Sequence, residues 1–357
     1  EYRGFFHIGM VTRNERNAII QHGTMTMVRR ELLQRIGWSE WCITEDAELG
    51  LRILDEGYAT TYIARSYGRG LMPDTFLDFK KQRSRWAFGA MQILRRHFDA
   101  LIHGRDTGLT SGQRYHFVAG WLPWLADGFN LLVNLAALVW SLVMVLFPRH
   151  IEPPLMLFSV LPLSLFLFKL VKLLHLYRAR VGATFTQTIA AAIAGLGLSH
   201  TVGSAMLSGF VNKDRPFFRT PKRTTRHAWL QSLAAAREEA VLMCGLWIAA
   251  FAVSSIPQMD GDQPGLVGSP DLTVWVTVLL VQSIPYAAAV IVSLVSSLQL
   301  RGDWIGEARD PVFDASAAAA EPDLDSVATG TSTLPVGSLA RNNGGALPAT
   351  AKLDSAK

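Results

Sequence analysis

The chain has 357 residues, of which 50% are hydrophobic, with a mean hydropathy of +0.22 and a formal net charge of +5. This composition is too apolar for an average soluble protein. The basic residues cluster beside apolar stretches, as in the cytoplasmic loops of membrane proteins, and no nucleic-acid-binding motif accompanies them. Two cysteines, Cys42 and Cys244, form neither a disulfide framework nor a metal-ligand spacing. We therefore expect a membrane protein with no nucleic-acid partner.

Residues 1–75 have the pattern of the C-terminal part of a soluble α/β domain. Thr24–Val28 and Ala59–Ala64 are rich in strand-forming residues and predict two strands. A helix that stops at Gly37 follows the first of them. The chain starts at Glu1 rather than Met and shows no signal peptide, so we expect that an N-terminal part of the protein precedes it.

A second helix is predicted between Thr44 and Gly57. Thr44 is suited to cap its N-terminus, and the acidic Glu45 and Asp46 fall in the first turn, where they complement the helix dipole. Gly57 follows the last turn, as a residue that ends a helix commonly does.

Residues 76–102 predict a long cationic amphipathic helix, with one apolar stripe and Lys or Arg over much of the remaining surface. Such a helix can lie in a membrane interface. The alternative is an ordinary surface helix packed on the preceding domain.

Four apolar stretches predict membrane crossings within a membrane domain at 103–300: 121–147, 155–176, 240–256 and 272–298. The longest would span about 40 Å as a helix, which exceeds the hydrocarbon core of a bilayer. Residues 184–210 are also apolar, but a crossing there would place the basic segment 212–227 outside the cell, against the positive-inside rule. We therefore expect an interfacial or re-entrant helix at 184–210. The composition of residues 309–357 predicts a disordered tail on the cytoplasmic side.

Four side chains predict the chemistry. Gln82, Arg85 and Trp86 are spaced to share one face of a helix. A guanidinium can bind a diphosphate through paired hydrogen bonds, an indole can stack on a sugar, and Gln can bond hydroxyl groups. Asp46 could act as a base toward a hydroxyl. Together they indicate a site for glycosyl transfer.

The motifs that carry these residues resemble those of a known family. "TED" (44–46) followed by "QRSRW" (82–86) resembles the processive family-2 glycosyltransferases, which include the cellulose, chitin and hyaluronan synthases. "FFRTPK" (217–222) resembles their FxVTxK gating loop, with Arg219 where the pattern has Val. The resemblance covers roughly residues 5–300. It implies a GT-A-type α/β domain, of which only the C-terminal part is present, followed by an α-helical polytopic membrane domain.

The resemblance also implies residue roles. Asp46 would be the catalytic base, supported by Glu45, and Arg85 and Trp86 would contact the diphosphate and the acceptor sugar. The other implied contacts are Gln82 with His22, Gly23 and Thr24 toward the acceptor, and Phe217, Thr220 and Lys222 in the gating loop.

The implied reaction transfers a sugar from a UDP-sugar, preferably UDP-glucose, to a growing β-glucan at the bacterial inner membrane. The family's uridine-binding and metal-binding aspartates lie upstream of every motif found here. We therefore expect Mg²⁺ or Mn²⁺ only in the full-length enzyme, no metal site in this fragment, and no activity from the fragment itself.

Polar residues in the first apolar stretch suggest a path for the polymer. Asp127, Asn130 and Asn134 lie near one helical face and, with Trp124, could line a channel. The alternative is hydrogen bonding between helices. Two other functions also remain open: a non-processive transferase acting on a lipid-linked sugar, and a non-catalytic transporter or scaffold.

Overall fold

A computed structural model of the chain describes residues 4–65, 73, 75–148, 150–154, scattered positions between 163 and 179, 182–212, 234–256 and 270–297. Most of the predicted crossing at 155–176 lies outside these residues. So do the predicted gating-loop residues Phe217, Thr220 and Lys222 and the tail at 309–357.

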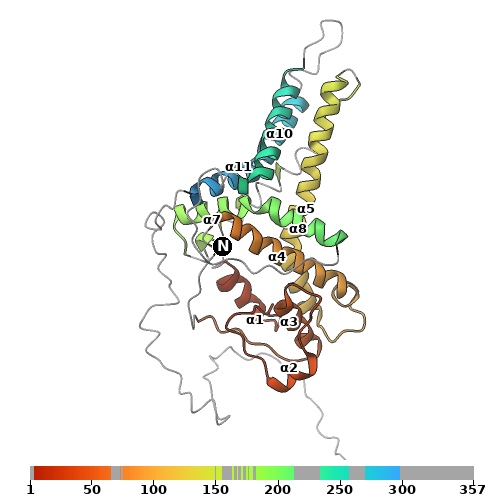
Figure 1. The fold of residues 1–357 in the computed structure, drawn as a ribbon, viewed down its shortest axis with the longest axis vertical. Coiled ribbons are helices and arrows are strands. Elements are labelled where there is room, and N and C mark those ends of the chain that lie inside the picture. Colours follow the sequence, from red (N-terminus) through yellow and green to blue (C-terminus); the bar gives the residue numbers. More distant parts are fainter. Residues whose placement is uncertain are drawn as a thin grey trace, which may run out of the picture. The chain divides into compact units, whose positions relative to one another are not determined.

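The regular secondary structure of the described residues is helical (Figure 1). Two π-helical segments, η1 (Gly4–Met10) and η2 (Asp99–His103), accompany α1 (Val11–Asn14), α2 (Arg30–Ile36), α3 (Glu45–Asp55) and α4 (Phe76–Arg96). The remaining helices are α5 (Ser111–Leu146), α7 (Phe185–Gly197), α8 (Ser199–Val211), α10 (Arg237–Ser254) and α11 (Pro270–Ser297).

Both predicted strands are wrong, because neither segment has a strand partner among the described residues. The backbone N–H groups of Thr60 and Tyr62 instead donate to the side-chain oxygens of Asn17 and Asn14, each at 2.7 Å. Two asparagine side chains thus satisfy donors that a neighbouring strand would otherwise accept from. The α/β character expected for residues 1–75 is not confirmed.

The segment predicted as the first strand contains a turn. The Thr26 hydroxyl donates to the carbonyl of His22 at 2.5 Å, and Met25 has a φ of +57°. A positive φ is incompatible with an extended strand. The turn therefore prevents residues 24–28 from running straight.

The predicted ends of α2 and α3 are confirmed. Gly37 and Gly57 follow these helices with φ of +69° and +82°, the left-handed region that glycine enters at little cost. The capping role of Thr44 is wrong, because its side chain makes no capping hydrogen bond. Its hydroxyl lies 3.4 Å from the Cys42 sulfur instead, in the packing against α4.

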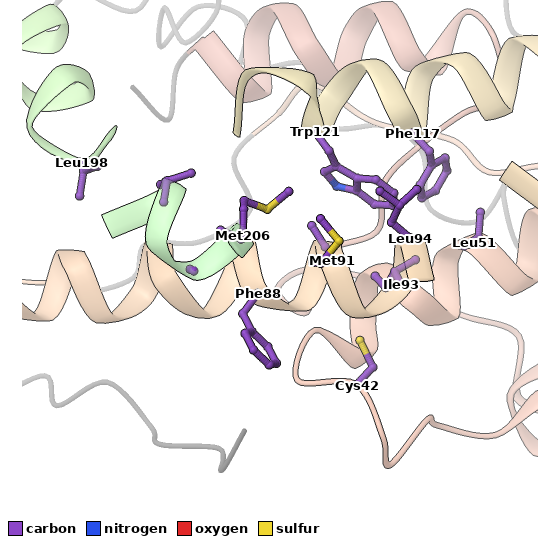
Figure 2. Packing of buried hydrophobic residues seen from close by; sticks show 14 of the residues in the cluster. Cys42, Leu51, Phe88, Met91, Ile93, Leu94, Phe117, Trp121, Leu198 and Met206 are labelled. Carbon is purple, nitrogen blue, oxygen red and sulfur yellow. The ribbon is translucent and has the colours of Figure 1, made fainter. Parts of the chain in front are cut away.

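The predicted amphipathic helix is confirmed as α4, and η2 follows it after a break at His97. Figure 2 shows α4 between two groups of elements: Trp121 and Phe117 of α5 and Met206 of α8 lie along one side, and Cys42 lies on the other. Phe88, Met91 and Ile93 of α4 are each 0% exposed. The helix is therefore part of the core and does not lie on the domain surface.

α5 begins ten residues before the predicted crossing because Thr110 and Gln113 form a capping box at its start. The apolar stretch at 184–210 forms two helices, α7 and α8, that meet at Leu198. By length and composition, three described segments could cross a membrane: Ser111–Leu146, Phe185–Val211 and Asp271–Ser296. α10, at the predicted crossing 240–256, has 18 residues and is not among them.

α8 crosses closely against two helices. A Cβ atom built on Gly203 would lie 2.6 Å from the Asp127 carbonyl of α5, and one on Gly209 would lie 2.7 Å from the Met91 Cβ of α4. Small residues at such crossings allow backbones to approach. α8 therefore ties the N-terminal elements to α5.

Candidate functional site

The turn that carries Thr44, Glu45 and Asp46 packs directly on the helix that carries Gln82, Arg85 and Trp86. The contact is made at Gly89, one turn after Trp86. A Cβ atom built there would lie 2.5 Å from the Thr44 Cγ2 and 2.9 Å from the Thr44 Cβ. Only a residue without a side chain leaves room for this approach.

Gln92, one turn further along α4, holds the same segment by hydrogen bonds. Its side-chain oxygen accepts from the Ile43 N–H at 3.0 Å, and its side-chain nitrogen donates to the Trp41 carbonyl at 3.1 Å. The residue is 7% exposed. Gly89 and Gln92 had no predicted role, although both follow Arg85 at helical spacing on its own face of α4.

The Asp46 carboxylate is fixed by two backbone donors. The Gly23 N–H donates to one oxygen at 2.5 Å, and the Ala47 N–H donates to the other at 2.8 Å. The predicted acceptor segment at 22–24 therefore lies beside Asp46. Gly23 and Thr24 are exposed, and the half-buried His22 ring packs edge-on against Phe6 at 5.2 Å.

Glu45 is half-buried in the first turn of α3. The buried acid of this turn is Glu48, which is 1% exposed and had no predicted role. Its carboxylate accepts from Arg52 at 2.9 Å and lies 3.0 Å from His97, just after α4. Burial alone would raise the pKa of Glu48, but the hydrogen bonds with His97 and Arg52 outweigh it and hold that pKa below its usual value.

Arg52 connects α3 to the end of α2. Its two terminal nitrogens donate to the carbonyls of Ile36 at 2.7 Å and Gly37 at 2.9 Å. Because Arg52 and His97 share Glu48, one buried carboxylate joins α2, α3 and α4. This network sets the position of the helix on which Asp46 lies.

Gln82, Arg85 and Trp86 are half-buried on α4. The Arg83 guanidinium lies over the Trp86 ring at 4.7 Å from its centroid and over the Phe79 ring at 5.1 Å. Such stacking is attractive and restrains the indole. The aromatic side chain of the motif is therefore held by its own helix.

A buried ionic cluster joins α4 to the apolar helices. Lys80 lies 2.7 Å from Glu239 of α10, which is 0% exposed, and also donates to the Ala235 carbonyl at 2.9 Å. His200 of α8 lies 3.1 Å from the same carboxylate. The sequence showed Lys80 only as one of several basic residues on an amphipathic helix.

The candidate channel residues on α5 differ in burial. Asn134 is 0% exposed, and its side-chain nitrogen donates to the Tyr286 hydroxyl of α11 at 2.7 Å. This bond matches the alternative of hydrogen bonding between helices. Trp124, Asp127 and Asn130 are half-buried.

No group of three His, Cys, Asp or Glu side chains able to hold a metal ion occurs among the residues that the structure describes.

Comparison with known proteins bears on the same segments. Residues 3–178 match the family described as glycosyl transferase family group 2. The chain is similar to UDP-forming cellulose synthase catalytic subunits of three bacteria. It is 35% identical over 98 residues to that of Komagataeibacter sucrofermentans (27% of this chain, 12% of that protein). It is 37% identical over 99 residues to that of Pseudomonas fluorescens (28% and 13%) and 34% over 99 residues to that of Xanthomonas axonopodis pv. citri (28% and 13%). The matched region thus spans only 12–13% of the length of these relatives.

Proposed function

We propose that this chain supplies the acceptor side of a processive, inverting β-glycosyltransferase, because residues 3–178 match the family-2 glycosyltransferases and the chain is similar to cellulose synthase catalytic subunits. The observation that carries the proposal is the seating of the Thr44–Asp46 turn on α4. Gly89 and Gln92 hold this turn on the helix that bears Arg85 and Trp86.

The proposed chemistry follows from the residue types. The Asp46 carboxylate takes the proton of an acceptor hydroxyl, and the oxygen attacks the anomeric carbon of a UDP-sugar. The bond from that carbon to the diphosphate oxygen breaks, UDP leaves, and the configuration at the carbon inverts. Arg85 binds the diphosphate and Trp86 stacks on the acceptor sugar.

The donor sugar and the polymer are proposed from the similar proteins. The similar proteins carry the description "UDP-forming", which supports a UDP-sugar as the donor. We propose UDP-glucose as the donor and a β-glucan as the product. A divalent metal, when bound, would neutralise charge on the leaving diphosphate. The described residues offer no group of three side chains that fits such an ion.

Position in the membrane is proposed from the helices and the charge pattern. Ser111–Leu146 and Asp271–Ser296 are two of the three segments long and apolar enough to cross. With crossings also at 155–176 and 240–256 and with 184–210 interfacial, the basic segment 212–227 is cytoplasmic. Phe217, Thr220 and Lys222 of that segment would close over the nucleotide, and the polymer would leave between the helices of a bacterial inner-membrane protein.

Asp46→Asn tests the proposal. The full open reading frame that encodes this chain is expressed, and membranes receive radiolabelled UDP-glucose or UDP-N-acetylglucosamine with Mg²⁺. Loss of a general base lowers rates by about 10²–10⁴-fold, so we expect polymer from the wild type and at least ~100-fold less from Asp46→Asn. Asp99→Asn is the matched control, because the Asp99 side chain is 70% exposed and bonds His103, four residues later.

Each other result has a distinct meaning. Equal polymer from Asp46→Asn and wild type would refute the assignment of the base. Label transferred only to lipid would identify a non-processive transferase. No transfer from either donor would refute the proposed function.

A further inference from the structure

Gln92 is placed to control the geometry of the proposed site without touching a substrate. Its side-chain amide donates to one backbone group and accepts from another, both in the segment that leads into Thr44. The amide thereby pairs with residues 41–43 much as a peptide group of a neighbouring strand would. A buried amide with both ends bonded to one segment fixes the position of that segment along the helix axis.

The same face of α4 carries Arg85, Gly89 and Gln92, which follow one another at spacings of four and three residues. Gly89 allows Thr44 to lie against the helix, and Gln92 determines where along the helix it lies. Because Asp46 follows Thr44 by two residues, the distance between Asp46 and Arg85 depends on these two contacts. Glu48 and His97 support the same packing from the far end of α4.

We propose that Gln92 is a positioning residue that fixes the Asp46 carboxylate relative to Arg85, a role that rests on the proposed function. An error of about 1 Å in such a placement can lower a rate by ~10²-fold. The proposal therefore predicts a loss in kcat, with little change in the KM for the donor.

Cys42 offers a readout that does not depend on activity. It is one residue from the two backbone groups that Gln92 holds, is 5% exposed, and has its sulfur 3.4 Å from the Thr44 hydroxyl. Burial raises the pKa of this thiol from 9.0 to about 11. Since thiolate is the species that reacts with alkylating reagents, Cys42 should react slowly while the segment stays on α4.

The test uses Gln92→Met, which keeps the size of the side chain and removes its hydrogen bonds to Trp41 and Ile43. We expect kcat per folded molecule to fall about 10–100-fold and alkylation of Cys42, followed by mass spectrometry of its peptide, to accelerate at least ~10-fold. Gln113→Met is the matched control. Gln113 is also buried and uses both ends of its amide, on Thr110 and Asn17. Its substitution should lower stability while leaving kcat per folded molecule and Cys42 alkylation unchanged.

Gln92→Glu separates positioning from a general loss of stability. At high pH its carboxylate accepts from the Ile43 N–H but repels the Trp41 carbonyl. At low pH the protonated group donates to that carbonyl and restores both bonds. We expect the rate of Gln92→Glu, relative to wild type at the same pH, to rise as the pH falls through the pKa of the new carboxyl group.

Two results would overturn the role of Gln92 while leaving the proposed function intact. They are an unchanged kcat in Gln92→Met when Asp46→Asn abolishes polymer, and unchanged Cys42 alkylation in Gln92→Met. Absence of transfer by the wild type would refute the proposed function and the catalytic part of this role with it. The alkylation result would still show whether Gln92 holds the segment.

Discussion

Gly89→Ala is the smallest change that should separate the two halves of the proposed site. The added methyl group would lie 2.5 Å from the Thr44 Cγ2, whereas two carbon atoms in contact need about 3.5–4.0 Å. Thr44 or α4 must therefore move by about 1 Å. Thr44 is 9% exposed and has little free space to move into. Relief of this overlap costs about 1–3 kcal/mol.

The stability change should nevertheless be modest, because alanine favours a helix over glycine by about 1 kcal/mol. We expect a net loss of about 0–2 kcal/mol in the free energy of unfolding and a rate that falls ~10–100-fold, since the 1 Å shift acts on the placement of Asp46. Stability and activity should thus change by very different amounts.

The assay compares polymer synthesis per folded molecule with thermal unfolding in detergent. Gly195→Ala is the control, because a Cβ atom built on that glycine of α7 meets nothing within 4 Å. It should leave the rate unchanged and the stability equal or higher. A Gly89→Ala variant with the wild-type rate would refute the argument that this contact positions the site.

Two predictions concern the helices beyond α4. Lys80→Met leaves the carboxylate of Glu239 buried without its lysine, so it should lower the free energy of unfolding by about 3–5 kcal/mol. The double variant Lys80→Met with Glu239→Gln should have a higher unfolding temperature than Lys80→Met alone. Full additivity of the two substitutions would contradict a direct ion pair. Tyr286→Phe removes the hydroxyl to which Asn134 donates. An interhelical hydrogen bond of this kind contributes about 0.6–1.7 kcal/mol. We therefore expect a small fall in the unfolding temperature and normal polymer export. Lost export with normal synthesis would instead indicate that these side chains line the channel.

Helix ends were predictable from sequence because their signals are local. Gly37 and Gly57 have the positive φ that favours glycine after α2 and α3, and no distant contact is needed to specify it. The start of α5 was missed although its signal is equally local. Thr110 and Gln113 form a capping box that starts α5 ten residues before the predicted crossing, outside the apolar stretch.

Strands were predicted wrongly because a strand depends on a partner that local composition does not contain. Thr60 and Tyr62 donate their backbone N–H groups to Asn17 and Asn14, which are more than forty positions away. The same limit applies to Thr44, whose type and position suit a cap. Packing against Gly89 and Cys42 uses its side chain instead.

The candidate site was predictable in its reactive residue types but not in its connections. Asp46 and Arg85 stand out because a carboxylate and a guanidinium in family motifs have evident chemistry. Gly89 and Gln92 do not, because a glycine and a glutamine within a helix are ordinary in composition. Only their position distinguishes them, because both lie among buried apolar residues on the face of α4 that carries Arg85. A buried side-chain amide such as that of Gln92 requires hydrogen-bond partners.

α4 connects the segment that carries Asp46 to the apolar helices. Its Gln92 side chain holds residues 41–43, which lead into the Thr44–Asp46 turn. One turn further along, the Arg95 guanidinium donates to the carbonyls of Gly209 and Asn212 at the C-terminus of α8, where the helix dipole favours a positive charge. A shift of α4 relative to α8 would break these hydrogen bonds. If the proposed function holds, the sugar bound by α4 therefore stays at a fixed distance from the helices through which the polymer leaves.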